Sequence, residues 1–403
     1  MPAGNLEILK IACNYGADAV YIGGEAYGLR AKADNFSVEK IKEGAAYAHS
    51  LGKKLYVTAN IFAHNYDVEG IKAYFTELKD SGVDALIISD PGVIELAKEY
   101  ADGIDIHLST QANTTNYLSY HFWWKQGIKR VVSARELSLK EIAEIRKKIP
   151  EEMEIESFVH GAMCISYSGR CLLSNYFTGR DANRGLCTHP CRWKYTLNEE
   201  TRPGEYLPVF ENERGTYIFN SRDLCMIEHI PAMTEAGIDS FKIEGRMKTG
   251  LYVATVARAY RRAIDDYFTD SDVYRRNLEW YKNEITKCTN RLFTTGFYFG
   301  KPSDKDQIYD SNTYNTDYIY LGVAEAIDKD GLVRITQRNK FLKGDVIEIM
   351  SPNGRNTEAV VEGIFALSGE EQESAPHAKQ PLYIAISEKA EAGDILRQCI
   401  KTS

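Results

Sequence analysis

Tyr15-Gly16-Ala17-Asp18-Ala19-Val20-Tyr21-Ile22 has the pattern of a helix end that leads directly into a short buried strand. Glycine suits the left-handed cap that ends many helices, and strands of parallel sheets are short and apolar because both of their faces are buried. The same pattern recurs at residues 81–88, 126–132 and 236–243. We therefore expect alternating helices and strands, the arrangement that builds a parallel α/β sheet.

The first 250 residues contain seven such strand patterns, at residues 19–22, 54–59, 85–88, 104–109, 130–133, 154–160 and 240–244. Helical patterns lie between most of them, and many begin with Ser, Asp or Pro. Seven strands are one fewer than a (β/α)8 barrel needs. We expect a TIM-like barrel whose first strand is missing, lies upstream of Met1 or is made in another way. An open doubly wound sheet is the alternative.

The composition is that of a globular protein, because 44% of the 403 residues are hydrophobic and 26% are charged. The chain starts without a signal-peptide pattern, and no apolar run reaches the ~18–20 residues that span a bilayer. We therefore expect a cytoplasmic protein with no membrane partner. The formal net charge of −8 excludes a bulk electrostatic binder of nucleic acid, although a local basic patch is compatible with it.

Two further regions follow from the pattern along the chain. Residues 161–231 form an insertion that leaves the C-terminal end of a strand, which is the end where barrel enzymes build their sites. Later in the chain, short strand patterns and turns such as 329–331 and 352–354 predict a small all-β barrel or sandwich. We expect a barrel domain over residues 1–300 and a C-terminal β domain over residues 301–403.

Four of the eight cysteines, Cys164, Cys171, Cys187 and Cys191, fall within 28 residues of the insertion, with the spacing C-x6-C-x15-C-x3-C. In a cytosolic chain a dense group of thiols is more typical of metal binding than of disulfides. Four thiolates hold either a zinc ion or an iron–sulfur cluster. The C-x2-C pairs of zinc ribbons are absent, which favours the cluster. Cys225 is an alternative to Cys191 as the fourth ligand.

Residues 156–174 resemble the signature of peptidase family U32. Flanking motifs are similar as well, at residues 2–5, 18–24, 107–111, 220–224 and 242–248. The resemblance runs from residue 2 to about residue 300, and the C-terminal strands are similar to the family's C-terminal domain. It is closest to the branch that hydroxylates tRNA.

The resemblance implies a barrel that carries a 4Fe–4S cluster on four cysteines. It also implies formation of 5-hydroxyuridine at the wobble position of the tRNA anticodon loop, with prephenate as the hydroxyl donor. A peptidase is the alternative, but no Gly-x-Ser-x-Gly or His-Glu-x-x-His motif is present. A third reading is a non-catalytic, cluster-bearing subunit that works with a related partner chain.

Polar residues at the predicted strand ends are candidates for the rest of the site. His107, His160 and Glu244 are the candidate catalytic residues. A dicarboxylate such as prephenate requires Arg or Lys nearby, and the candidate substrate-binding residues are Arg246, Lys248, Arg135, Asn60 and Gln111. Arg30 and Lys242 are further cations near strand ends.

Residues 161–195 are locally basic in an acidic protein. Arg170, Arg180, Arg184, Arg192 and Lys194 stand there against Asp181 alone, and aromatic residues are interleaved with them. Such mixtures suit stacking of an extruded RNA base with its phosphates on arginines, whereas a solvated loop around the cluster is the alternative.

Overall fold

The computed structural model describes residues 1–25, 27–28, 35–164, 166–193, 196–198, 206–208, 220–302, 307–308 and 315–400. The chain divides into two compact units. The first comprises Met1–Leu9, Asp18–Met247 and Arg291–Thr313, and the second comprises Lys10–Ala17, Lys248–Asn290 and Tyr314–Ser403. Within the described residues, no helix combines the length and the apolar character needed to cross a membrane.

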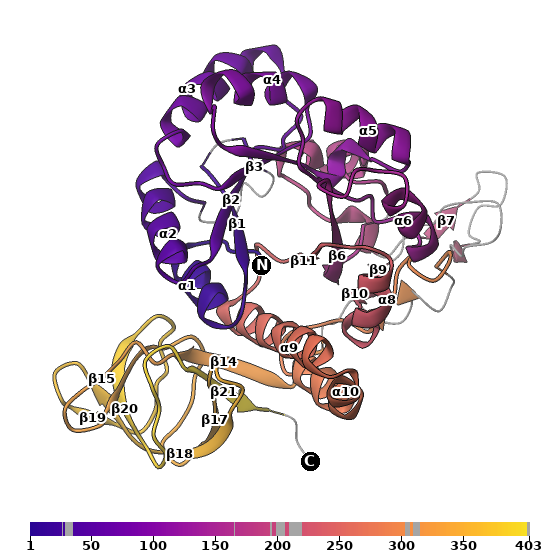
Figure 1. Cartoon of the computed structure of the whole chain (residues 1–403). Helices are drawn as coiled ribbons and strands as arrows, with labels where there is room; N and C mark the ends of the chain where they lie inside the picture. Colours follow the sequence, from indigo (N-terminus) through magenta and orange to yellow (C-terminus); the bar gives the residue numbers. More distant parts are fainter. Residues whose placement is uncertain are drawn as a thin grey trace. The chain divides into compact units, whose positions relative to one another are not determined.

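The first unit contains the predicted seven strands in a parallel arrangement: β1 (Ala19–Gly23), β2 (Lys54–Thr58), β3 (Ala85–Ile88), β4 (Asp105–Leu108), β5 (Arg130–Val132), β6 (Glu154–Ala162) and β11 (Ser240–Ile243). Neighbours in the chain are neighbours in the sheet, and β11 pairs with β6. A doubly wound sheet would instead reverse its strand order at a switch point. The predicted barrel-like α/β fold is therefore confirmed, and Figure 1 shows the strands arranged in a ring.

The place of the absent first strand is taken by the first three residues of the chain. Met1 and Ala3 lie along β1 in the parallel direction, because the Tyr21 N–H donates to the Met1 carbonyl at 2.8 Å and the Ala3 N–H donates to the Tyr21 carbonyl at 3.1 Å. Three residues are too short to produce the periodicity that predicts a strand. The expectation of a missing strand is therefore refined: a short stretch of parallel pairing is present.

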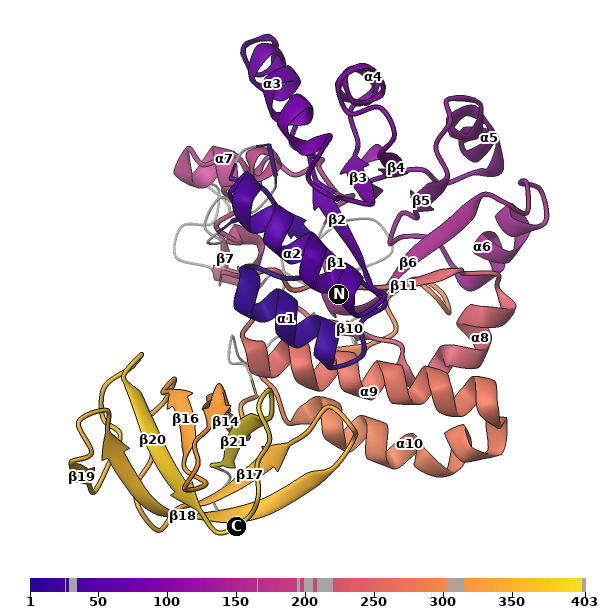
Figure 2. The same ribbon diagram turned by 60° about the vertical axis from the view of Figure 1, so that its left-hand side comes forward.

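Helices outside the ring connect the strands (Figure 1 and Figure 2). They are α2 (Val38–Ser50), α3 (Val68–Leu78), α4 (Pro91–Tyr100), α5 (Tyr117–Lys125), α6 (Leu139–Arg146) and α8 (Ile230–Glu235), while α1 (Leu6–Asn14) precedes β1. Side-chain caps begin several of them. The Asp90 carboxylate accepts the N–H groups of Gly92 and Val93 at 2.8 and 3.0 Å, as the sequence led us to expect.

The insertion follows β6 and contains α7 (Leu173–Thr178), the 3₁₀ turns η3 (Ala182–Arg184) and η4 (Pro190–Arg192), and the strands β7 (Thr196–Asn198), β8 (Tyr206–Pro208), β9 (Asn220–Ser221) and β10 (Asp223–Cys225). β10 returns antiparallel beside β6 and also pairs with β12 (Phe293–Thr294). The buried Asp223 carboxylate accepts two bonds from the Arg291 guanidinium, at 2.6 and 3.1 Å, which fixes this return.

The second unit joins two long helices to an antiparallel β domain. The helices are α9 (Gly250–Thr269) and α10 (Ser271–Thr286), and the main strands are β14 (Tyr318–Val323), β16 (Val333–Thr336), β17 (Val346–Met350), β18 (Asn356–Ala366), β20 (Pro381–Ile386) and β21 (Ile395–Cys399). Glu284 of α10 accepts from Arg258 at 2.5 Å and from Arg397 of β21 at 2.7 Å, with all three side chains buried. These helices therefore group with the β strands, whereas the predicted boundary at residue 300 assigns them to the barrel domain.

Candidate functional site

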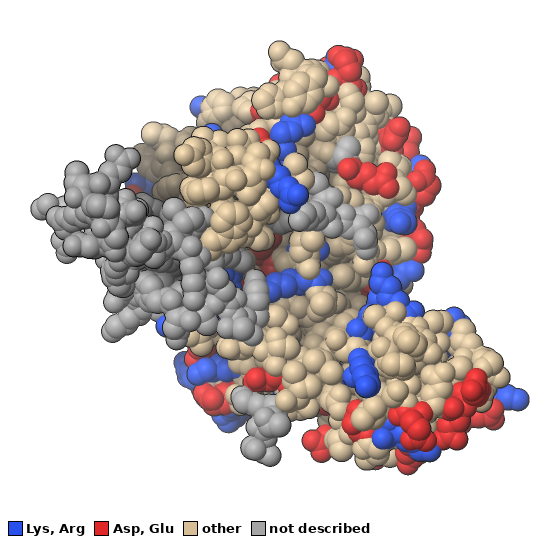
Figure 3. Space-filling view, turned by 180° about the vertical axis from the view of Figure 1, so that it is seen from behind, with Lys and Arg blue, Asp and Glu red and all other residues tan. Residues whose placement is uncertain are grey.

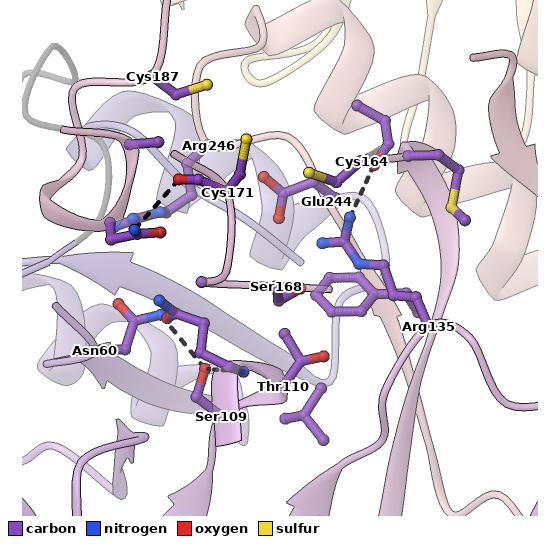
Figure 4. Close-up of a pocket in the computed structure, with 18 of the residues that line it drawn as sticks. Asn60, Ser109, Thr110, Arg135, Cys164, Ser168, Cys171, Cys187, Glu244 and Arg246 are labelled. Carbon is purple, nitrogen blue, oxygen red and sulfur yellow. Dashed lines mark hydrogen bonds between the residues drawn. The ribbon is translucent and has the colours of Figure 1, made fainter. Parts of the chain in front are cut away.

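A cavity of about 200 Å³ lies at the C-terminal ends of the barrel strands. It is lined from all seven strands or the residues just after them, and from the insertion (Figure 4). The strand-end side chains are Tyr21, Thr58, Asn60, Ile87, Ser109, Val132, Phe158, Lys242 and Glu244. This is the end of a barrel at which active sites are built.

The four clustered cysteines all line this cavity. Cys164 follows β6, Cys171 precedes α7, Cys187 lies between η3 and η4, and Cys191 belongs to η4. Figure 4 shows the thiols of Cys164, Cys171 and Cys187 on the side of the cavity opposite Asn60 and Ser109. Cys225, the alternative fourth ligand, lies on β10 and is not among the lining residues.

The four thiols are not gathered as the ligands of a single ion would be. Within the described part of the chain, no three Cys, His, Asp or Glu side chains converge on one point as the ligands of one ion would. A 4Fe–4S cluster takes one thiolate per iron, so its ligands surround a larger body. The His189 N–H also donates to the Cys187 sulfur at 3.4 Å, and such bonds tune cluster potentials.

The insertion is tied to the loop after β2 by an ion pair. Both guanidinium nitrogens of Arg184 donate to the Asp67 carboxylate, at 2.9 and 3.0 Å, and this bond lowers the pKa of Asp67 below its ordinary value. The Phe62 N–H also donates to the Asn183 carbonyl at 3.2 Å. The cysteine-bearing segment is therefore held over the end of the barrel.

Arg246 is a buried cation at the cavity, only 6% exposed. Its Nη1 donates to the Thr58 hydroxyl at 3.1 Å. A Cβ atom at Gly23 would stand 2.1 Å from that same nitrogen, so a side chain there would displace the guanidinium. Glycine at the end of β1 therefore makes the room that Arg246 occupies.

Arg135 is a second lining cation. Its guanidinium carbon lies 4.0 Å from the ring centroid of Phe158, and its Nη1 donates to the Ala162 carbonyl at 3.0 Å. Stacking of this kind is a preference of guanidinium over ammonium groups. The bond to Ala162, two residues before Cys164, links this cation to the start of the cysteine segment.

Lys242 is a third lining cation, and it belongs to a buried charge group inside the barrel. Its Nζ donates to Glu156 at 2.5 Å, and Arg130 contacts the other oxygen of Glu156 at 3.3 Å. Burial by itself would raise the pKa of Glu156, but Lys242 and Arg130 outweigh it and lower this pKa to about 2. The carboxylate is therefore charged, and it holds the Lys242 ammonium in place at the cavity.

The remaining polar lining comes largely from β2 and β4. Asn60 donates weakly to the Ser109 hydroxyl at 3.5 Å, and Gln111 is 3% exposed with no hydrogen-bond partner for either end of its amide in the described structure. Gly169 of the insertion, with φ of 74°, covers this amide so closely that a Cβ atom would lie 3.2 Å from its nitrogen. A buried amide without a partner costs free energy, which a bound polar ligand would recover.

Of the predicted site residues, the cavity brings together the four cysteines with Asn60, Gln111, Arg135, Glu244 and Arg246. Glu244 also accepts from the Tyr21 hydroxyl at 3.2 Å. Lys248 belongs to the second unit, where its ammonium lies 5.0 Å from the Tyr252 ring centroid. Arg30 lies outside the described residues.

Neither candidate histidine lines the cavity. His107 is buried beneath it, edge-on to Tyr56 at 4.7 Å, and burial lowers its pKa to about 3. A general acid or base near neutral pH needs a pKa much closer to 7, so this placement indicates a neutral core histidine. His160 is also buried and packs against Phe293 at 5.7 Å.

Comparisons with known proteins match nearly the whole length of the chain. The profile of peptidase family U32 matches residues 4–308, and that of the family's C-terminal domain matches residues 316–397. The tRNA hydroxylation protein P1 of Bacillus subtilis is 44% identical over 98% of this chain and 93% of its own length.

Two other relatives carry different names. An uncharacterized protease of Methanocaldococcus jannaschii is 41% identical over 90% of this chain and 89% of its own length. The 23S rRNA 5-hydroxycytidine C2501 synthase of Escherichia coli is 38% identical over 73% of this chain and 43% of its own length. With both profiles matched in order, the chain belongs to peptidase family U32.

Proposed function

We propose that this protein takes part in tRNA hydroxylation and that the reaction converts wobble uridine to 5-hydroxyuridine. The observation that carries the proposal is the 44% identity to a tRNA hydroxylation protein along nearly the whole of both chains. The rRNA relative is named for the same modification at C5 of the other pyrimidine. We propose a cytoplasmic location as well, in keeping with the localisation expected from the sequence.

We propose that Cys164, Cys171, Cys187 and Cys191 hold a 4Fe–4S cluster at the cavity. The position of all four thiols along one cavity supports this assignment, as does the N–H bond to the Cys187 sulfur. When bound, such a cluster supplies a redox centre beside the reacting groups. Cys225, on β10, is not among the residues that line the cavity, so Cys191 is the preferred fourth ligand.

We propose prephenate, a small dicarboxylate, as the hydroxyl donor. Arg246 and Arg135 line the cavity from different strands and would each hold a carboxylate, while the Gln111 amide supplies a further hydrogen-bonding group. In the overall exchange the base replaces its C5–H by C5–OH and the donor replaces C–OH by C–H. The two electrons that the base loses are therefore gained by the donor, and no other oxidant is needed.

A peptidase is less well supported by the geometry. The Cys164 sulfur has one hydrogen-bond contact in the described structure, to the Ser166 hydroxyl at 4.0 Å, and His160 does not line the cavity. A cysteine peptidase needs a histidine within hydrogen-bond reach of the nucleophilic sulfur. Cys164 also shares its cavity with three other thiols, as expected of a cluster ligand.

Nucleoside analysis of tRNA from a deletion strain tests the proposal. We expect 5-hydroxyuridine and its derivatives to disappear, and to return on expression of the wild-type chain. A variant with Cys171→Ser should fail to restore them, whereas Cys288→Ser, which changes a buried cysteine of the second unit, should restore them. Unchanged tRNA in the deletion strain would refute the function. Activity that requires a second purified chain would instead identify a subunit of a hetero-oligomer.

A further inference from the structure

We propose that an exposed aromatic surface on the insertion and the β2 loop binds unpaired bases of RNA beside the cavity. We call it the aromatic face and define it by Tyr66, Tyr176, Phe177, Trp193, Arg170 and Arg180. The inference rests on the proposed function, because it assigns a place on this chain to the RNA substrate. It extends that function by naming the surface that holds the RNA.

The aromatic face exposes side chains that folding normally buries. Tyr176 is 83% exposed, Tyr66 is 73% exposed and Trp193 is 44% exposed. Single exposed hydrophobic residues are common on protein surfaces, but a group of large aromatic ones marks a binding surface. These residues come from two segments that the Arg184–Asp67 ion pair holds together.

The rings are arranged by contacts within the protein. Tyr176 and Phe177 lie edge to face at 5.2 Å between centroids, and Phe177 lies 6.2 Å from Trp193. In the β2 loop, Tyr66 is stacked on His64 at 5.3 Å with 4° between the rings. Each of these rings has an aromatic neighbour and still exposes surface on which a base can stack.

Positive charge accompanies these rings. Arg170 and Arg180 are exposed and form no ion pair within the described part of the chain, although the protein as a whole carries a net charge of −8. The Arg170 guanidinium lies 5.8 Å from the Phe62 ring centroid. Figure 3 shows Lys and Arg side chains standing among uncharged residues on one side of the molecule. Exposed arginines without an ion pair suit the phosphate groups of RNA.

The aromatic face borders the cavity, because the same segments line both. Cys171 lies one residue from Arg170, and Cys191 lies two residues from Trp193. A base that reacts in the cavity must leave its stack, and the unpaired bases beside it then need new stacking partners. Sequence-tolerant RNA binding uses this combination of aromatic rings and arginines, worth about five- to a hundredfold in affinity per stacked base.

Alanine variants of the aromatic face test the proposal by direct RNA binding. The probes are an unmodified tRNA transcript and a fully paired RNA hairpin of equal length. Tyr176→Ala and Tyr66→Ala should each weaken tRNA binding about five- to a hundredfold. Tyr176→Phe should keep wild-type affinity. Phe122→Ala removes a ring that is 54% exposed on the outer helix α5, and as the matched control it should leave affinity unchanged. The paired hairpin should bind weakly to all proteins.

Three results would overturn the inference. The first is wild-type tRNA affinity in both alanine variants, and the second is an equal loss in Phe122→Ala. The third is an alanine variant that binds RNA normally but no longer binds a protein partner or no longer self-associates, as measured by sedimentation. That result would make the aromatic face a protein interface. Iron content and circular dichroism of each variant check that the fold is kept. If deletion strains retain 5-hydroxyuridine, the proposed function fails; if the variants bind and modify tRNA normally, only this inference fails.

Discussion

The buried carboxylate of Glu156 offers a quantitative test of how the floor of the cavity is held together. Glu156 accepts from Lys242 at 2.5 Å, from the Ser240 hydroxyl at 2.8 Å and from Arg130 at 3.3 Å, and its side chain is 5% exposed. Its pKa is lowered from 4.5 to about 2 although burial acts in the opposite direction. At about 1.4 kcal/mol per pKa unit, the charged form contributes about 3 kcal/mol to the free energy of unfolding.

We expect Glu156→Gln to lower the free energy of unfolding by about 3–5 kcal/mol at pH 7, since it leaves the buried Lys242 ammonium without its carboxylate. The matched control is Glu154→Gln. Glu154 binds the same Arg130 at 2.6 Å, but its side chain is 44% exposed, so its loss should cost at most about 1 kcal/mol. Urea unfolding followed by circular dichroism measures both changes.

The effect should also depend on pH in one direction. A carboxyl group with a lowered pKa stabilises the fold fully above its unfolded pKa, and this contribution is lost as the pH falls through the folded pKa. For Glu156 the window runs from about pH 4.5 down to about pH 2. The difference between wild type and Glu156→Gln should therefore shrink by about half or more between pH 7 and pH 3. Equal costs for the two Gln variants, or a difference independent of pH, would refute the reasoning.

Two further predictions concern the ligands of the cavity. Anaerobically purified protein should be brown, with about four irons per chain. The Cys191→Ala variant should lose this iron, whereas the Cys225→Ala variant should keep it. The reverse result for the two variants, or a colourless protein with one bound zinc, would contradict the assignment. Arg246→Lys keeps the charge but loses the planar fork, so calorimetric titration should show prephenate binding weakened about ten- to a hundredfold, with iron content and helicity unchanged. Equal affinity would remove Arg246 from the donor site, and parallel loss of iron would make it structural.

The barrel was predictable because each of its units is local. A helix end with glycine and a short apolar strand repeat along the chain, and all seven predicted strands are observed, while β10 and β12 of the same sheet were not predicted. The short pairing of Met1–Ala3 with β1 was not predictable, because it depends on hydrogen bonds to a strand some 20 residues away rather than on any pattern in three residues. The grouping of α9 and α10 with the β domain likewise depends on the buried contacts of Glu284 with Arg397, which lie 113 residues apart.

The cysteines and most of the polar strand-end residues were predictable as members of one region, because barrel sites form at the C-terminal ends of strands. Which of them face the cavity depends on burial. His107 and Gln111 lie four residues apart, yet Gln111 lines the cavity while His107 is enclosed in the barrel interior beside Tyr56. Asn183 and Thr58 contact Cys171 and Arg246, and nothing in their sequence surroundings distinguishes them from ordinary polar residues.

The place of Lys242 at the cavity could have been predicted from the sequence. Side chains alternate across a strand, so residues two apart lie on one face. Lys242 lies on β11 and lines the cavity together with Glu244 and Arg246, which follow the strand. On β6, Glu156 pairs with Ser240, two residues before Lys242, and its carboxylate reaches the Lys242 ammonium at 2.5 Å. A charged residue at an inward position of a buried strand requires an opposite charge on the neighbouring strand, because an unpaired buried charge costs several kcal/mol. The buried Glu156 on β6 therefore implies cations on the neighbouring strands, and Lys242 on β11 and Arg130 on β5 are those cations.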